Sequence, residues 1–303
     1  MPFVDWLADS SSLMTYLNKI AIVVTLGLII RWFRSDDESV EPEVQDRERA
    51  ATQLFVSGAI FGAGLTAFGY ARDPFGPAVV FTNSLLGLVI SIAACGTELH
   101  PVGENAQRQP ILRSYRIGRL VPGPLSGAVV LVALTLVGSA SAAILTATPD
   151  KAGQPGRVLT GQCGTLGGTE VAYPGSFYSV PLVAFAVVGA IVAILALRAI
   201  ATRRQLGSSP ETDFTSRRRS GRRVISGLGI ALSIPTMGIS TVGSDAINVL
   251  GCGSVTLLTL EEVWNFTLPA ATFVLLWSVG SLVVSLGRTN KTVPADDIGT
   301  RAT

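Results

Sequence analysis

The sequence predicts an all-α protein, a polytopic bundle of helices that crosses a membrane seven times. Only 15% of the residues are charged and the mean hydropathy is +0.49, whereas soluble domains are about 25% charged. Seven stretches are apolar and long enough to cross the bilayer, which takes about 20 helical residues. Lysine and arginine also collect in alternate connectors between these stretches. Together these observations place the chain among multi-pass membrane proteins.

The predicted spans follow one another along most of the chain. They cover residues 13–33, 51–70, 77–95, 124–146, 177–200, 224–242 and 266–286. The first has no basic segment ahead of it and no cleavage site of small residues behind it, so we expect a retained helix rather than a signal peptide.

The basic residues predict the orientation. All but four of the 23 lysines and arginines belong to the same alternate set of connectors and tail, the exceptions being Lys19, Arg72, Lys151 and Arg157. Short cytoplasmic loops carry the excess of Lys and Arg. We therefore expect an N-terminus outside and a C-terminus in the cytoplasm of a cell membrane.

One connector holds a dense arginine cluster, made of Arg217, Arg218, Arg219, Arg222 and Arg223. We interpret it as a topology anchor that also contacts anionic lipid headgroups. A nucleic-acid site is not favoured because no aromatic residues interleave with the arginines.

The spans divide the chain into an opening helix and three hairpins. The expected segments are the first helix (1–33), a mixed-charge cytoplasmic linker (34–50), a first hairpin (51–95), a cytoplasmic loop (96–123), a second hairpin (124–200) with an outer loop (147–176), a basic cytoplasmic loop (201–223), a third hairpin (224–287) with an outer loop (241–265), and a cytoplasmic tail (288–303). The two outer loops would form a small extracytoplasmic cap.

Short motifs recur in the three hairpins and suggest a 1+2+2+2 repeat. An aliphatic-Ser-Gly triplet opens the first span of each pair, and Pro-x-x-x-Phe opens the second; these motifs start at Val56, Leu125, Ile225, Pro77, Pro181 and Pro269. The alternative is convergence, since proline suits the first turn of any helix.

The three cysteines divide by the predicted side of the membrane. Cys163 and Cys252 fall in the two outer loops, where an oxidising exterior permits a disulfide between them; the alternative is two unpaired thiols. Cys95 lies near the cytoplasmic end of its span and is interpreted as a reduced core residue.

Ionisable groups inside a membrane are costly and therefore notable, and Lys19 is the one clear case within the spans. Lys19 is expected to extend its ammonium to the headgroups, with pairing inside the bundle or a ligand role as alternatives. Asn83 can bond a partner helix or serve as packing glue. Pro235 predicts a kink that frees carbonyl groups.

The spans hold no Asp, Glu or His, which disfavours proton relays, haem ligation and histidine-based catalysis. We expect no cofactor, no catalytic residue and no metal site. Two groups of ionisable residues, Glu98-His100-Glu104 and Asp245-Glu261-Glu262, are interpreted as solvated. The alternatives are a metal site at the first group and a cation site at the mouth of the bundle at the second. The scarcity of lysine relative to arginine is typical of a GC-rich prokaryotic genome.

Three functional hypotheses follow. The first is a non-enzymatic scaffold, receptor-like element or accessory subunit of a membrane complex, which has lipids and other membrane subunits as partners. The alternative is a transporter or channel for a small or lipid-like substrate that is not coupled through buried carboxylates. An enzyme at the membrane surface is the least supported, because acids such as Asp36 and Asp37 lie in a linker without apolar periodicity.

Overall fold

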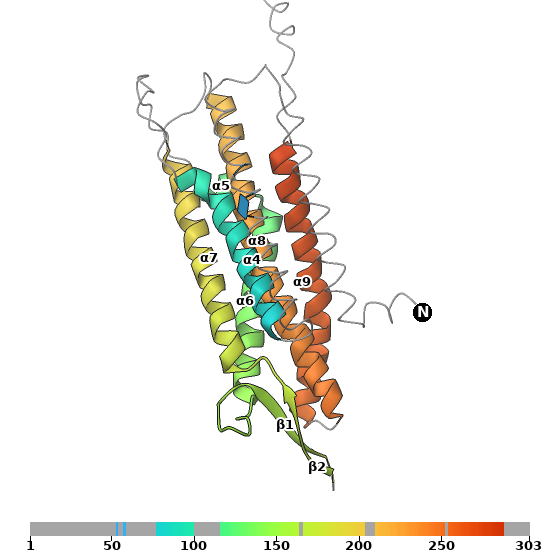
Figure 1. Ribbon diagram of the computed structural model, residues 1–303. Coiled ribbons are helices and arrows are strands. Elements are labelled where there is room, and N and C mark those ends of the chain that lie inside the picture. Colours follow the sequence, from blue (N-terminus) through green and yellow to red (C-terminus); the bar gives the residue numbers. More distant parts are fainter. Residues whose placement is uncertain are drawn as a thin grey trace, which may run out of the picture.

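The structure, a computed structural model, is mostly helical. It describes residues 53, 57, 58, 77–99, 116–163, 166–203, 210–251 and 254–287. The elements are α4 (Pro77–Leu99), α5 (Ile117–Leu120), α6 (Gly123–Thr146), β1 (Val158–Cys163), β2 (Leu166–Ala172), α7 (Ser176–Thr202), α8 (Pro210–Leu250) and α9 (Val255–Gly287). The long helices lie side by side in one elongated bundle (Figure 1).

Four helices in the described part of the chain, α6 to α9, are long and apolar enough to cross a membrane. A shorter apolar helix, Asn83–Gly96, lies within α4 and coincides with the predicted third span. The predicted first span lies outside the described residues, as does all of the second except residues 53, 57 and 58.

Helix α8 is the centre of the bundle. It contacts α4, α6, α7 and α9, and 89% of its apolar window is buried, against 33% for α6, α7 and α9. The outer helices turn large apolar side chains outward, such as Leu134, Leu145 and Phe266. This is the arrangement expected in lipid, where small residues favour helix contact and leucine is at home in the hydrocarbon.

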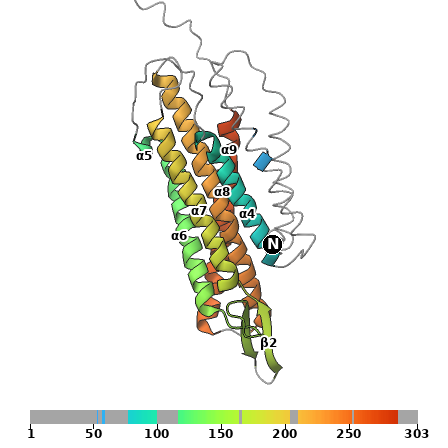
Figure 2. The same cartoon turned by 60° about the vertical axis from the view of Figure 1, so that its left-hand side comes forward.

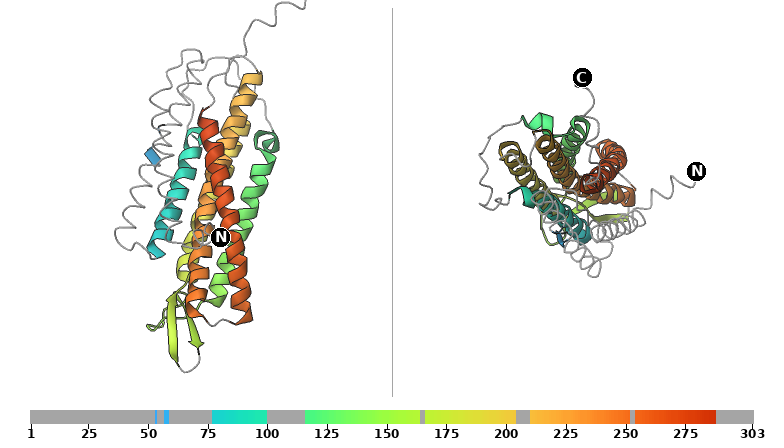
Figure 3. Two further views of the ribbon diagram at one scale, coloured as in Figure 1. Left: turned by 90° about the vertical axis from the view of Figure 1, so that its right-hand side faces the viewer. Right: turned by 90° about the horizontal axis from the view of Figure 1, so that it is seen from above.

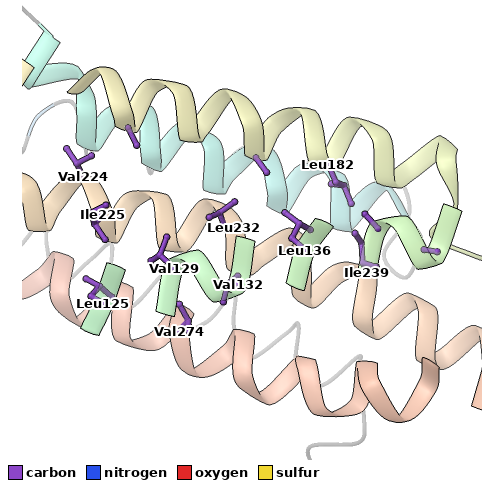
Figure 4. Close-up of a cluster of buried hydrophobic side chains, with 14 of the residues drawn as sticks. Leu125, Val129, Val132, Leu136, Leu182, Val224, Ile225, Leu232, Ile239 and Val274 are labelled. Atoms are coloured by element: carbon purple, nitrogen blue, oxygen red, sulfur yellow. The ribbon is translucent and has the colours of Figure 1, made fainter. Parts of the chain in front are cut away.

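Large aliphatic side chains fill the space between α8 and its neighbours. Figure 4 shows Leu125, Val129, Val132 and Leu136 of α6 with Leu182 of α7, Val274 of α9, and Val224, Ile225, Leu232 and Ile239 of α8. All are buried, and their burial fixes α6, α7 and α9 against the central helix.

The predicted bounds of the last two spans are wrong. Helix α8 begins at Pro210 rather than at 224, and α9 begins at Val255 rather than at 266. The predicted outer loop 241–265 is therefore helical apart from the turn near Gly251, whose φ of 61° suits the glycine that follows a helix. Hydropathy falls where Arg or Glu side chains begin, yet these residues are good helix formers.

The motifs of the proposed repeat occupy unequal places. Pro77 begins α4, but Pro181 and Pro269 lie inside α7 and α9. Leu125 lies near the start of α6, whereas Ile225 lies well inside α8. The interpretation of these motifs as equivalent helix starts is wrong, and the structure leaves the repeat without support.

The first outer loop forms a two-stranded antiparallel sheet. Val158 pairs with Ala172 and Cys163 with Leu166, with an irregularity between Gly161 and Cys163. Figures 1 and 2 show this hairpin at the same end of the bundle as the α8–α9 turn, with α5 at the other end. The fold is thus helical with one small strand pair, rather than entirely α.

Glycines allow the hairpin to join the bundle closely. Gly156 has a φ of 71°, and a Cβ atom there would lie 2.7 Å from the backbone nitrogen of Ser176. A side chain at Gly156 would therefore collide with the first turn of α7. Gly175, the residue before α7, is equally confined, since a Cβ atom there would lie 2.6 Å from the Gly156 carbonyl oxygen.

Candidate functional site

A line of small residues runs along one face of α8. Its members alternate spacings of three and four: Ser226, Gly229, Ser233, Thr236, Ser240 and Gly243. All six are buried. A repeat of seven residues keeps one face of a helix against one neighbour through a left-handed crossing. We call this line of residues the small-residue seam.

Helix α9 is the neighbour that covers the seam. A Cβ atom on Gly229 would overlap the hydroxyl of Ser278, and one on Gly243 would overlap the ring of Trp264. Between these points the Thr272 hydroxyl donates to Met237 Sδ at 3.8 Å. The two helices therefore pack antiparallel along most of their apolar length, as the left view of Figure 3 also shows.

Several hydroxyls at the seam have no hydrogen-bond partner within the described residues, namely those of Ser226, Ser233, Ser240 and Ser278. By contrast, Thr236 donates to the Leu232 carbonyl at 2.7 Å. A buried polar atom without a partner costs about 1–3 kcal/mol. The seam therefore offers neutral hydrogen-bonding groups but no group for acid–base chemistry.

Asn83 lies on α4, on the far side of α8 from α6. Gly87, one turn along, is in close contact with α8, since a Cβ there would lie 3.1 Å from Cα of Ala231. The Asn83 side chain is buried, and its Oδ1 has no hydrogen-bond partner in the described part of the chain. The expected bond from Asn83 to a partner helix is therefore not seen among these residues.

Pro235 lies inside α8, about one helical turn after Ala231, the residue that Gly87 of α4 contacts. Proline has no N–H, so the carbonyl of Ala231 loses its usual helical donor. Helix α8 nevertheless continues through Pro235 to Leu250. Packing of Gly87 against Ala231 holds the two helices together at this weakened turn.

Arg217 is fully buried, which corrects its expected role as a lipid contact. Its Nε–H donates to Asp213 Oδ2 at 2.7 Å. The Nη groups donate to the carbonyls of Ile200, Ala201 and Arg203 at 2.8–3.1 Å. These carbonyls lie at the end of α7, where no intrahelical donors remain. Arg217 therefore caps α7 from α8.

The other arginines of the cluster differ in exposure. Arg223 is also buried, so it too is poorly placed for headgroups. Arg218 is exposed, and Arg219 and Arg222 are half-buried. An α-helix distributes a run of arginines over all of its faces, so one cluster supplies both a buried cap and exposed charges.

Two aromatic rings close the other end of the bundle. Tyr173 follows β2 and its hydroxyl lies 2.6 Å from the Thr146 hydroxyl, while its ring centroid lies 6.0 Å from that of Trp264. Both rings are buried, so Trp264 does not face the bilayer interface as an aromatic-belt residue would. Burial raises the pKa of Tyr173 to about 12, although the hydrogen bond with Thr146 acts in the opposite direction.

The expected disulfide is not decided by the described residues. Cys163 ends β1, but its side chain is outside the described part, as is all of Cys252. The described part contains no disulfide, and Cys95 is buried there outside any disulfide. The backbone does bring β1 to the end of the bundle where α8 turns into α9 (Figure 1).

The remaining candidate residues, the predicted ionisable groups, form no metal-binding cluster in the described part. No group of three metal-ligating side chains occurs among the residues that the structure describes, so Asp245, Glu261 and Glu262 do not gather. Lys19, His100 and Glu104 lie outside the described residues, and so does the Glu98 side chain. Hydropathy does not predict the small-residue seam, because its serines, threonine and glycines interrupt an apolar stretch, although their regular spacing is visible in the sequence.

The fold and the seam define a helical protein with several apolar helices that could cross a membrane. No protein family, curated protein or solved structure matches the chain.

Proposed function

We propose that the chain is a multi-pass cell-membrane protein that acts without a catalytic site, as a scaffold, receptor-like or accessory subunit of a membrane complex. Its N-terminus is proposed to lie outside and its C-terminus in the cytoplasm, with seven crossings. A subunit of this kind needs a rigid core and exposed faces for partners.

Close backbone contacts along α8 carry this proposal. A Cβ atom on Gly221 would lie 2.7 Å from the Leu120 carbonyl oxygen, and one on Gly227 would lie 2.9 Å from Cβ of Ala94. Gly229 and Gly243 are equally tight against α9. Contacts at several levels of the central helix hold it against three different neighbours, which suits a static core better than a moving one.

The test is whether another membrane protein depends on this chain. We expect gentle purification to recover a second protein at a fixed ratio. Deletion of this chain should lower the cellular amount of that protein, and re-expression should restore it. If the chain purifies alone and its deletion changes the amount of no other membrane protein, the scaffold proposal fails.

The second candidate is a transporter or channel for a small neutral or lipid-like substrate. The buried hydroxyls of Ser226, Ser233 and Ser240 favour it, because such groups normally have partners. Together with Ser278 they line one side of α8 over several helical turns. A neutral solute or a file of water molecules would supply the missing hydrogen bonds.

Cysteine labelling separates the two candidates. In lipid nanodiscs, Ser233→Cys and the buried control Leu232→Cys are treated with a charged, water-borne thiol reagent and analysed by peptide mass. A hydrated pathway predicts that Ser233→Cys reacts and Leu232→Cys does not, whereas a dry core predicts that neither reacts. Arg218→Cys, an exposed position, should react in both cases.

A further inference from the structure

Helix α5 is fixed directly onto α8 at the basic end of the bundle. Leu120 is fully buried, and its carbonyl oxygen occupies the space beside Gly221 where a side chain would otherwise stand. The connection from α5 to α6 is extended at Val121 and Pro122, so α5 is a separate turn held by this contact.

The contact joins two arginine-containing segments. Arg116 and Arg119 belong to the α5 turn and are exposed. Arg218 and Arg222 stand on either side of Gly221 along α8, the first exposed and the second half-buried. Two segments distant in the sequence, each with two arginines, thus meet at the contact between Leu120 and Gly221.

These charges are not compensated by the described acids. At this end of the bundle the described acidic side chain is Asp213, which is buried and bound to Arg217. Helices α6, α7 and α9 contribute no acid here, since Glu261 and Glu262 lie at the opposite end of α9. Glu98 of α4 and Glu211 of α8 also belong to this end, but their side chains lie outside the described part. The patch therefore favours an anionic ligand.

The patch stands where the apolar parts of the helices begin. Helix α6 starts at Gly123, directly after α5, and α7 ends at Thr202 near the same level, because Arg217 binds its last carbonyls. In a bilayer crossed by these helices, headgroup phosphates would lie at this level. Exposed Ile117 adds an apolar contact on the α5 turn.

We propose that Arg116, Arg119, Arg218 and Arg222 form one binding site for the phosphate of an anionic phospholipid in the leaflet at this end of the bundle. Guanidinium groups bind phosphate through paired, charge-assisted hydrogen bonds. The site needs the protein to span a membrane, but it does not depend on the scaffold role.

Binding is tested on the purified full chain by native mass spectrometry and thermal unfolding. We expect phosphatidylglycerol to bind more tightly than phosphatidylcholine and to raise the unfolding temperature. Arg119→Gln with Arg222→Gln should weaken phosphatidylglycerol binding by roughly tenfold or more. The matched control, Lys151→Gln, removes an exposed charge at the opposite end and should leave binding unchanged.

A second variant separates a loss of lipid binding from a loss of folding. Arg116→Gln with Arg119→Gln changes only exposed side chains on α5 and should weaken binding while the helix content stays the same. Equal binding of both lipids, or equal losses in Lys151→Gln, would overturn the proposal. Displacement of the lipid by millimolar inorganic phosphate would also overturn it, because the ligand would then be free phosphate.

Discussion

Arg217 is predicted from the sequence to be a topology anchor, because a charged guanidinium resists translocation. In the folded protein the same group donates to Asp213 and to three carbonyls at the end of α7. Removal of one partner from such a buried pair leaves the other charged and unpaired.

We expect Arg217→Ala to be strongly destabilising, by about 3–5 kcal/mol, because Asp213 would remain buried without its partner. Arg218→Ala, at the exposed neighbouring position, should change stability by less than about 0.5 kcal/mol. Thermal unfolding in detergent measures both. Similar losses for the two variants would mean that the ion pair contributes little.

Gly227 is a second residue whose surroundings leave no room for a side chain. Gly227→Ala would place Cβ 2.9 Å from Cβ of Ala94 and 3.2 Å from Cα of Ser91, so we expect a loss of about 1–3 kcal/mol. Gly138→Ala meets nothing within 4 Å and should be neutral or stabilising by up to about 1 kcal/mol. Equilibrium unfolding of the two variants measures both effects. Because each changes glycine to alanine in a helix, the difference between them gives the cost of the close contact without the effect of helix propensity.

At the scale of elements, the β1–β2 hairpin is attached to the bundle through Tyr173. Its ring lies against Trp264, and its hydroxyl bonds Thr146 at the end of α6. The strand pair has its own backbone ladder, but two strands alone are marginally stable. The hairpin therefore depends on this aromatic attachment.

The raised pKa of Tyr173 gives this attachment a pH dependence. The pKa of Tyr173 is about 12 in the folded protein against 10.0 for an unperturbed tyrosine, so the folded protein holds this proton more tightly than the unfolded chain. The contribution of the protonated Tyr173 hydroxyl to the unfolding free energy is complete below pH 10. As the pH rises to 12, roughly 2–3 kcal/mol of this stability is lost. The difference in unfolding free energy between wild type and Tyr173→Phe should shrink over this range. A constant difference would contradict the assignment.

Helices α8 and α9 form the other decisive element pair. The contacts of Ser278 and Trp264 show that the two helices pack antiparallel. The seven-residue spacing of the small-residue seam fits one continuous contact along α8. The spacing is visible in the sequence, but its partner is not, because a small-residue face fits any helix that offers a matching surface.

At the scale of the whole molecule, the predicted disulfide depends on the predicted orientation, because both cysteines must lie on the oxidising outer side. Alkylation of intact cells with an impermeant reagent, followed by peptide mapping without reduction, should find Cys163 linked to Cys252 and Cys95 free. An N-terminal tag should also be reachable in intact cells. Free alkylation of both loop thiols would remove the staple, and a tag reached only after lysis would reverse the orientation.

The sequence alone determined the mostly helical fold with apolar helices that could cross a membrane, the approximate middles of five described helices and the concentration of arginine at one end. These properties follow from sums over neighbouring residues, since hydropathy and charge need no knowledge of long-range contacts. Only the tertiary structure decided that α8 is central, that Arg217 and Trp264 are buried, and that α5 meets Gly221. Burial depends on which face of a helix meets which neighbour, and that pairing is made between segments far apart in the chain.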